Sequence, residues 1–142
     1  DQKYYLRAYA VNGEGVSYGS SISFRTLELN HSTVWADAEP DGEAENWWTS
    51  PWFGSFNLKD ESGWLYHSEL GWAYALPSRG GGVWLWMDEI EWAWTDRGIY
   101  PFLFSHDPHS WLYFYGRSKG KVLFYRYSDN LWITKQLEVT VP

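Results

Sequence analysis

The sequence predicts an all-β chain: an array of aromatic-rich β-hairpin repeats with a period of about 20 residues, preceded by a separate two-strand hairpin. Tryptophan returns at intervals of 20, 20, 19 and 21 residues, at Trp52, Trp72, Trp92, Trp111 and Trp132. Aromatic residues make up 21% of the 142 residues, and in many segments they occupy alternate positions. Alternation is typical of strands, and a fixed period of this length is typical of a repeat array.

The first expected element is a hairpin over residues 3–26. KYYLRAYAV alternates as a strand does, Asn12-Gly13-Glu14-Gly15 is rich in turn residues, and SSISFRT predicts a second strand. These segments resemble the last two strands of a fibronectin type III domain. The resemblance implies that residues 1–27 are the end of such a domain, with Tyr4 as its tyrosine-corner residue. It also implies that Leu6, Ala8 and Ala10 face a sandwich core.

Two strands alone leave that apolar face open, so the hairpin is predicted to need a partner. The partner would be other copies of the chain or the rest of a precursor, and the start at Asp1-Gln2-Lys3, without a signal segment, suggests a piece cut from one. Residues 137–142 form a β-prone end that we expect to add to an unpaired strand edge, head to tail. The candidate assembly residues are Leu6, Ala8, Ala10, Ile22, Phe24, Leu137, Val139 and Val141.

Residues 28–47 are predicted to form an acidic linker, because this stretch contains carboxylates but neither Lys nor Arg. Asp37, Glu39 and Asp41 alternate ahead of Gly42, as carboxylates do at the start of a calcium loop. Pro40 and the non-acidic twelfth position depart from that pattern. A solvated linker is therefore preferred, with calcium as the alternative and otherwise no cofactor.

Residues 48–136 are predicted to form the hairpin array. Within each of the first two units the aromatic residues that define the repeat all have even residue numbers. A loop with an odd number of residues then places all of them on one face of the hairpin. The opposite face then carries Leu65, Ala73, Ala75, Leu85, Met87 and Ala93. Gly71 suits the left-handed position that closes a three-residue loop, and the longer loop SHDPHS restores Phe104 opposite Trp111.

One of the two faces should pack inside the array. The recurrence of tryptophan leads us to expect an aromatic core in which Trp72 and Trp92 hold equivalent buried places. The predicted core aromatics are Trp52, Trp64, Trp72, Trp84, Trp92, Trp111 and Trp132.

Residues 48–134 resemble, in pattern, the aromatic hairpin repeats of bacterial cell-surface proteins of the cell-wall-binding kind. The resemblance implies an extracellular or cell-surface location. Two functions follow: a structural module of a surface or filament-forming protein that self-associates, or a carbohydrate-binding module whose exposed rings stack on polysaccharide. Trp35, Trp47 and Tyr115 are the candidate stacking residues.

Catalysis is not expected. Glu69, Asp88, Glu89 and Glu91 fall in predicted turns, and His106 and His109 share a loop with Pro108. The sequence has no cysteine, so it has neither disulfides nor thiolate metal sites. A net charge of -7 argues against nucleic-acid partners, and the absence of a long apolar run argues against membrane insertion.

Overall fold

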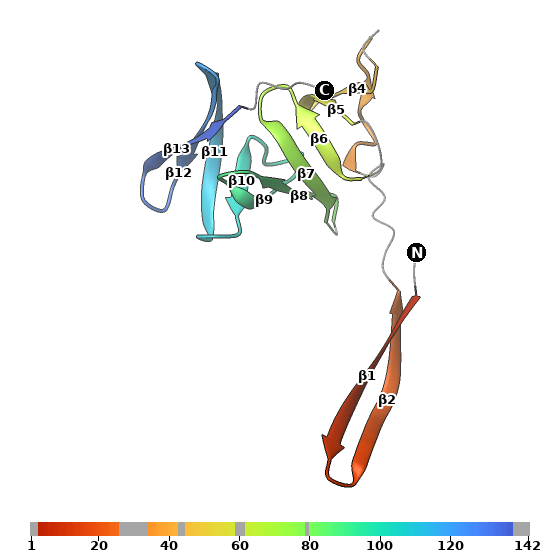
Figure 1. Cartoon of the computed structure of the whole chain (residues 1–142). Coiled ribbons are helices and arrows are strands. Elements are labelled where there is room, and N and C mark those ends of the chain that lie inside the picture. Colours follow the sequence, from red (N-terminus) through yellow and green to blue (C-terminus); the bar gives the residue numbers. More distant parts are fainter. Residues whose placement is uncertain (1–2, 26–33, 43–44, 59–61, 79, 138–142) are drawn as a thin grey trace.

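The computed structural model describes residues 3–25, 34–42, 45–58, 62–78 and 80–137, and it confirms the predicted all-β fold class. One sheet has two strands and the other has eleven, and Figure 1 shows the smaller sheet standing apart from the larger. The two-stranded sheet consists of β1 (Lys3–Asn12) and β2 (Gly15–Arg25). The larger sheet consists of β3 (Glu39–Pro40), β4 (Trp47–Ser50), β5 (Gly54–Asn57), β6 (Trp64–His67), β7 (Gly71–Pro77), β8 (Val83–Met87), β9 (Glu91–Thr95), β10 (Phe102–Ser105), β11 (Ser110–Ser118), β12 (Lys121–Arg126) and β13 (Leu131–Gln136).

In the β1–β2 hairpin, a bulge in β2 decides which side chains share a face. Leu6 lies opposite Ile22, whereas Tyr9 lies opposite Tyr18, so β2 has one residue more than β1 between these pairs. Strand alternation, corrected for the bulge, places the mainly apolar side chains on one side. We call this side the apolar hairpin face; it carries Tyr4, Leu6, Ala8, Ala10, Ile22 and Phe24.

The opposite face of the hairpin carries charge, unlike the apolar hairpin face, because cationic side chains lie over its tyrosine rings. The Arg7 guanidinium lies 3.8 Å from the centre of the Tyr18 ring, and the Lys3 ammonium lies 5.0 Å from that of Tyr5. Arg and Lys keep their charged groups in contact with water, so this face of the hairpin is suited to solvent. The two faces of the hairpin therefore differ in charge, and every residue of β1 is exposed, including apolar residues on both faces.

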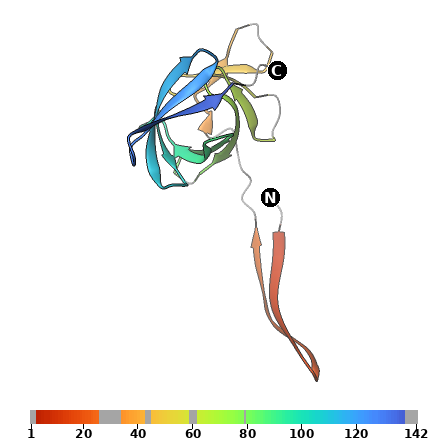
Figure 2. The same ribbon diagram turned by 60° about the vertical axis from the view of Figure 1, so that its left-hand side comes forward.

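In the eleven-stranded sheet, each strand is hydrogen-bonded only to its neighbours in the chain. Figure 2 shows that this sheet curls strongly. The curl brings β11 and β13 to the turns of the middle hairpins. Arg117 donates a hydrogen bond from Nη1 to the carbonyl oxygen of Ser68 at 3.0 Å, and the backbone N–H of Gln136 donates to Glu89 Oε1 at 3.4 Å. The sheet thus encloses an interior.

The registers are those that the parity of the aromatic residues predicts. Trp64 lies opposite Tyr74 and Tyr66 opposite Trp72 in one unit, and Trp84 and Trp86 lie opposite Trp94 and Trp92 in the next. His67 pairs with Gly71, whose φ is 75°, so the loop between them has three residues. The four-residue loop of the third unit restores Phe104 opposite Trp111.

The interior is lined by the face opposite the aromatic ladder. Leu65, Ala73, Leu85 and Ala93 are each completely buried. Phe53, Phe56, Phe114 and Phe124 fill the space between them and are also buried. A curled sheet crowds the side chains on its concave face, and small aliphatic residues suit that crowding.

The prediction that these tryptophans form the core is therefore wrong for most of them. Trp64, Trp111 and Trp132 are 43%, 42% and 55% exposed. Trp72, Trp84 and Trp92 are half-buried on the outer face rather than in the core. Of the predicted set, Trp52 packs against the core, although it too is only partly buried.

Two predicted boundaries also need correction. Val34 and Trp35 are buried in the core and β3 joins the large sheet, so residues 34–42 belong to the packed unit rather than to a linker. Leu137 is not a free end, because its backbone N–H donates to the carbonyl oxygen of Gly120 and its side chain packs against the core. Val139 and Val141 lie outside the described residues.

Candidate functional site

The outer face of the large sheet is covered by aromatic rings that contact one another across the strands. Trp64 lies edge to face with Tyr74 and with Trp86, at centroid separations of 5.5 and 5.9 Å. Tyr66 and Trp72 meet in the same way at 5.5 Å. Edge-to-face pairs are favoured by the ring quadrupole, so the rings hold each other in place without a ligand.

Six of these rings form one connected group on β10–β13 and in the turn after β12. We call the group the aromatic patch; it consists of Phe102, Tyr113, Tyr115, Tyr125, Tyr127 and Trp132. Trp132 lies 5.4 Å from both Tyr115 and Tyr125, and Tyr127 lies 5.2 Å from Tyr125. The patch is a continuous aromatic surface open to solvent at several rings.

The most exposed ring of the patch stands at a β-bulge. Phe114 lies opposite Phe124 and Gly116 opposite Leu123, so Tyr115 is an extra residue in β11. Gly116 has a φ of 127°, which favours glycine at that position. Bulges re-aim side chains, and Tyr115 is 66% exposed with its ring perpendicular to that of Trp132.

Polar groups at the β12–β13 turn border the patch. The Tyr125 hydroxyl lies 2.9 Å from Asn130 Oδ1 and donates to it. Arg126 donates to both carboxylate oxygens of Asp129, at 3.0 and 2.6 Å. The hydrogen bond from Arg126 lowers the pKa of Asp129, so this pair stays ionised and largely neutralises itself.

The three predicted stacking residues have different positions. Trp35 is 7% exposed, so its prediction as a surface ring is wrong. It lies in the core against Phe53 and Phe56, with centroids 4.8 Å away in both cases, and it stacks on Trp52. Trp47 is half-buried, and its ring is nearly perpendicular to that of Tyr66. Tyr115 is exposed and belongs to the aromatic patch.

The acidic residues considered for catalysis lie at hairpin turns, and two of them accept backbone hydrogen bonds. Glu69, Asp88, Glu89 and Glu91 are exposed at hairpin turns. Asp88 accepts a hydrogen bond from the neighbouring backbone, and Glu89 accepts the N–H of Gln136. These contacts stabilise a turn and hold the end of β13.

The histidines divide into one structural residue and a pair on the surface. His67 is buried, and burial lowers its pKa to about 4, an effect that its hydrogen bond to the Phe53 carbonyl only partly opposes. His106 and His109 are exposed, with ring centroids 5.5 Å apart, and they pack against Trp84 and Phe104. The role of His67 depends on a carbonyl group 14 residues earlier in the chain, so the local sequence does not reveal it.

The predicted calcium residues do not converge in the described part of the chain. Asp37 forms an ion pair with Arg97 at 3.1 Å. Glu39 lies in the short strand β3, and Asp41 donates its backbone N–H to the carbonyl of Trp47. Within the described ranges, no three His, Asp or Glu residues come close enough together to hold a metal ion.

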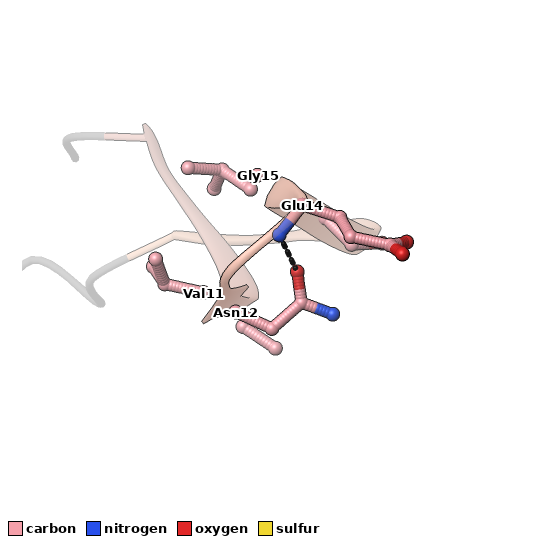
Figure 3. A pocket seen from close by; sticks show the side chains of 7 residues that line it. Val11, Asn12, Glu14 and Gly15 are labelled. Carbon is pink, nitrogen blue, oxygen red and sulfur yellow. Dashed lines mark hydrogen bonds between the residues drawn. The ribbon is translucent and has the colours of Figure 1, made fainter.

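A shallow hollow lies at the tip of the β1–β2 hairpin (Figure 3). There the backbone N–H of Glu14 donates to Asn12 Oδ1 at 2.9 Å, which closes the turn. Every residue around it is exposed, so the hollow is a feature of the turn rather than a ligand site. The residues around it are Ala10, Val11, Asn12, Glu14, Gly15, Val16 and Ser17.

The chain matches no family model, no curated protein and no solved structure, so its likeness to other proteins stays at the level of pattern. Among the described residues, no helix is long and apolar enough to cross a membrane. Two surfaces remain as candidates for function: the apolar hairpin face and the aromatic patch.

Proposed function

We propose that this chain is a non-enzymatic, extracellular structural module that associates with other copies of itself through the apolar hairpin face. One observation carries the proposal. Leu6, Ile22 and Phe24 are 58%, 60% and 52% exposed, although they lie side by side on one face of the hairpin. Contiguous apolar surface of this kind marks an interaction site.

The two faces of the hairpin suit different surroundings. The cations over the tyrosine rings on the opposite face would lose their hydration if they were buried. The apolar hairpin face carries no charged side chain, so it can pack against a second sheet at the usual separation of about 10 Å. A sandwich of two hairpins is therefore the simplest assembly that covers the apolar side and leaves the cations in water.

The predicted C-terminal donor strand is replaced in this proposal by a second hairpin. The backbone N–H of Leu137 already donates to the Gly120 carbonyl, and its side chain packs against the core of its own sheet. Among the described strands, β1 and β2 pair only with each other, so further strands can add at the outer edge of either one. The resemblance to the end of a fibronectin type III domain supports a sandwich, and the cell-surface pattern supports the extracellular location.

Sedimentation velocity over a micromolar concentration series tests the proposal. The wild-type chain should form dimers or larger species as its concentration rises. The double variant Leu6→Thr/Ile22→Thr keeps strand-forming residues but removes apolar surface, and it should stay monomeric. The matched control Val11→Thr/Val16→Thr alters the opposite face and should associate as the wild type does.

Two results would count against self-association. A wild-type chain that stays monomeric at every concentration would mean that the face is covered by other strands of the same protein. A Leu6→Thr/Ile22→Thr variant that associates normally would place the contact elsewhere on the molecule.

A further inference from the structure

We propose that the aromatic patch binds an uncharged polysaccharide, with the rings of Tyr115 and Trp132 packing against sugar rings. This binding site is separate from the apolar hairpin face, and it does not depend on self-association. The proposal rests on the exposure of two neighbouring rings. Tyr115 and Trp132 are 66% and 55% exposed, they contact each other, and Trp132 also packs against Tyr125.

The patch is arranged before any ligand arrives. Trp132 is held between Tyr115 and Tyr125, with both centroids 5.4 Å away, and Tyr125 is held in turn by Tyr127. Rings fixed in this way lose little conformational entropy on binding. The C–H groups on one side of a sugar ring form an apolar surface that packs on such rings, while its hydroxyl groups remain hydrated at the rim.

The polar groups beside the patch suit hydroxyl groups rather than charges. Four of its six members are tyrosines, whose hydroxyls donate and accept hydrogen bonds. Asn130 offers a side-chain amide next to Tyr125, to whose hydroxyl it is already bonded. The nearby ions, Arg126 and Asp129, are paired with each other. A neutral ligand with many hydroxyls therefore fits the patch better than an ionic one.

Other ligands of aromatic surfaces fit less well. Single-stranded nucleic acid also stacks on rings, but it needs cations along its phosphates, and this chain has a net charge of -7. The same charge opposes an anionic membrane surface.

Affinity electrophoresis of the full chain in gels containing soluble polysaccharide tests the inference. The probes are hydroxyethylcellulose, xyloglucan and galactomannan, with alginate as the acidic comparison. Neutral polysaccharide should slow the wild type, and Tyr115→Ala/Trp132→Ala should weaken the apparent affinity by about tenfold or more. Trp64→Ala is the matched control, because Trp64 is a 43% exposed ring on the same outer face but on β6.

Several outcomes would overturn the inference. Wild-type mobility that no neutral polysaccharide changes would do so, as would equal retardation of the double variant and the wild type. Retardation by alginate alone would point to an ionic ligand. Loss of self-association in Tyr115→Ala/Trp132→Ala, without a change in polysaccharide binding, would reassign the patch to contacts between copies. Thermal unfolding of each variant shows whether its fold is retained.

Discussion

His67 Nε2 lies 2.6 Å from the carbonyl oxygen of Phe53, 14 residues earlier in the chain. The second ring nitrogen, Nδ1, accepts the backbone N–H groups of Glu69 and Leu70, both at 3.0 Å. This pattern assigns the proton to Nε2 and leaves Nδ1 as an acceptor. A neutral imidazole thereby ties the turn before β5 to the turn after β6.

The stability of the protein should fall as pH falls from about 6.5 to about 4. The pKa of His67 is lowered from 6.5 to about 4 on folding, so between these values the unfolded chain binds one proton more than the folded chain. The contribution of neutral His67 is fully present above pH 6.5 and is lost as pH decreases toward 4. The expected loss from this residue is about 3 kcal/mol, measured by urea unfolding at a series of pH values.

The histidines on the surface provide the control for that pH dependence. His67→Gln should be less stable at neutral pH but should show a flatter pH profile than the wild type. The matched control is His106→Gln/His109→Gln, which removes two exposed imidazoles and keeps the buried one. A wild-type profile that His67→Gln does not flatten would mean that the acid sensitivity arises from the carboxylates.

The two sides of the sheet should respond differently to loss of a ring. Phe53 is 1% exposed and packs against Trp35, Phe56 and His67 at centroid separations of 4.8, 5.9 and 4.5 Å. Phe53→Ala should cost about 3–5 kcal/mol of unfolding free energy. Trp64→Ala on the outer face should cost about 1 kcal/mol, the order expected for lost edge-to-face contacts. Comparable costs in chemical denaturation would show that the outer rings are as important as the core.

Gly82→Ala should destabilise the hairpin formed by β8 and β9. A Cβ at Gly82 would lie 2.6 Å from Nε1 of Trp94, and the indole is rigid and held by its 3.0 Å hydrogen bond to Ser78 Oγ. The expected cost is about 1–3 kcal/mol, as for other overpacked sites. Gly13→Ala, where a Cβ meets nothing within 4 Å, serves as the control in thermal unfolding. Equal melting temperatures for the two variants would contradict the close packing.

Gly71→Ala should destabilise the protein more than Gly120→Ala. Both glycines have a left-handed φ, 75° and 76°, so the backbone strain of about 1 kcal/mol is common to both. A Cβ at Gly71 would also lie 2.8 Å from Leu137 Cδ2, whereas one at Gly120 would meet open space. The difference should shrink in a Leu137→Ala background, where only the milder 3.3 Å approach to Lys135 Nζ is left, and urea unfolding of the double variants can measure it. A difference that does not shrink would mean that Leu137 does not lie over this turn.

The hairpin registers could be predicted because they depend on local chemistry. Gly71 permits a three-residue loop, and the loop length fixes which residues lie opposite each other. Because Trp64 and Trp72 both have even residue numbers, all even-numbered side chains of the unit lie on one face and all odd-numbered ones on the other. The four-residue loop before Trp111 follows the same logic, so the third hairpin was predictable too.

The direction in which the sheet curls could not be predicted by that logic. Both faces are apolar, so alternation alone does not say which one is inside. The informative signal was size: Ala73, Ala75 and Ala93 are small enough for a concave surface, whereas tryptophans have room on a convex one. Trp35 was misplaced for another reason. It lies in an acidic stretch that resembles a linker, and only the tertiary fold brings it against Phe53 and Phe56.

The sequential order of the eleven strands has a consequence for how this protein folds. Pairing between adjacent strands closes only short loops, so the contact order of the sheet is low and hairpins can form early and independently. Val122 and Phe124, however, line the interior from β12, near the end of the sheet. A growing chain can therefore build its strands one hairpin at a time, but its core is sealed only when the final hairpin closes over the earlier turns. Cooperativity should appear late in synthesis, after most of the hydrogen bonds have already formed.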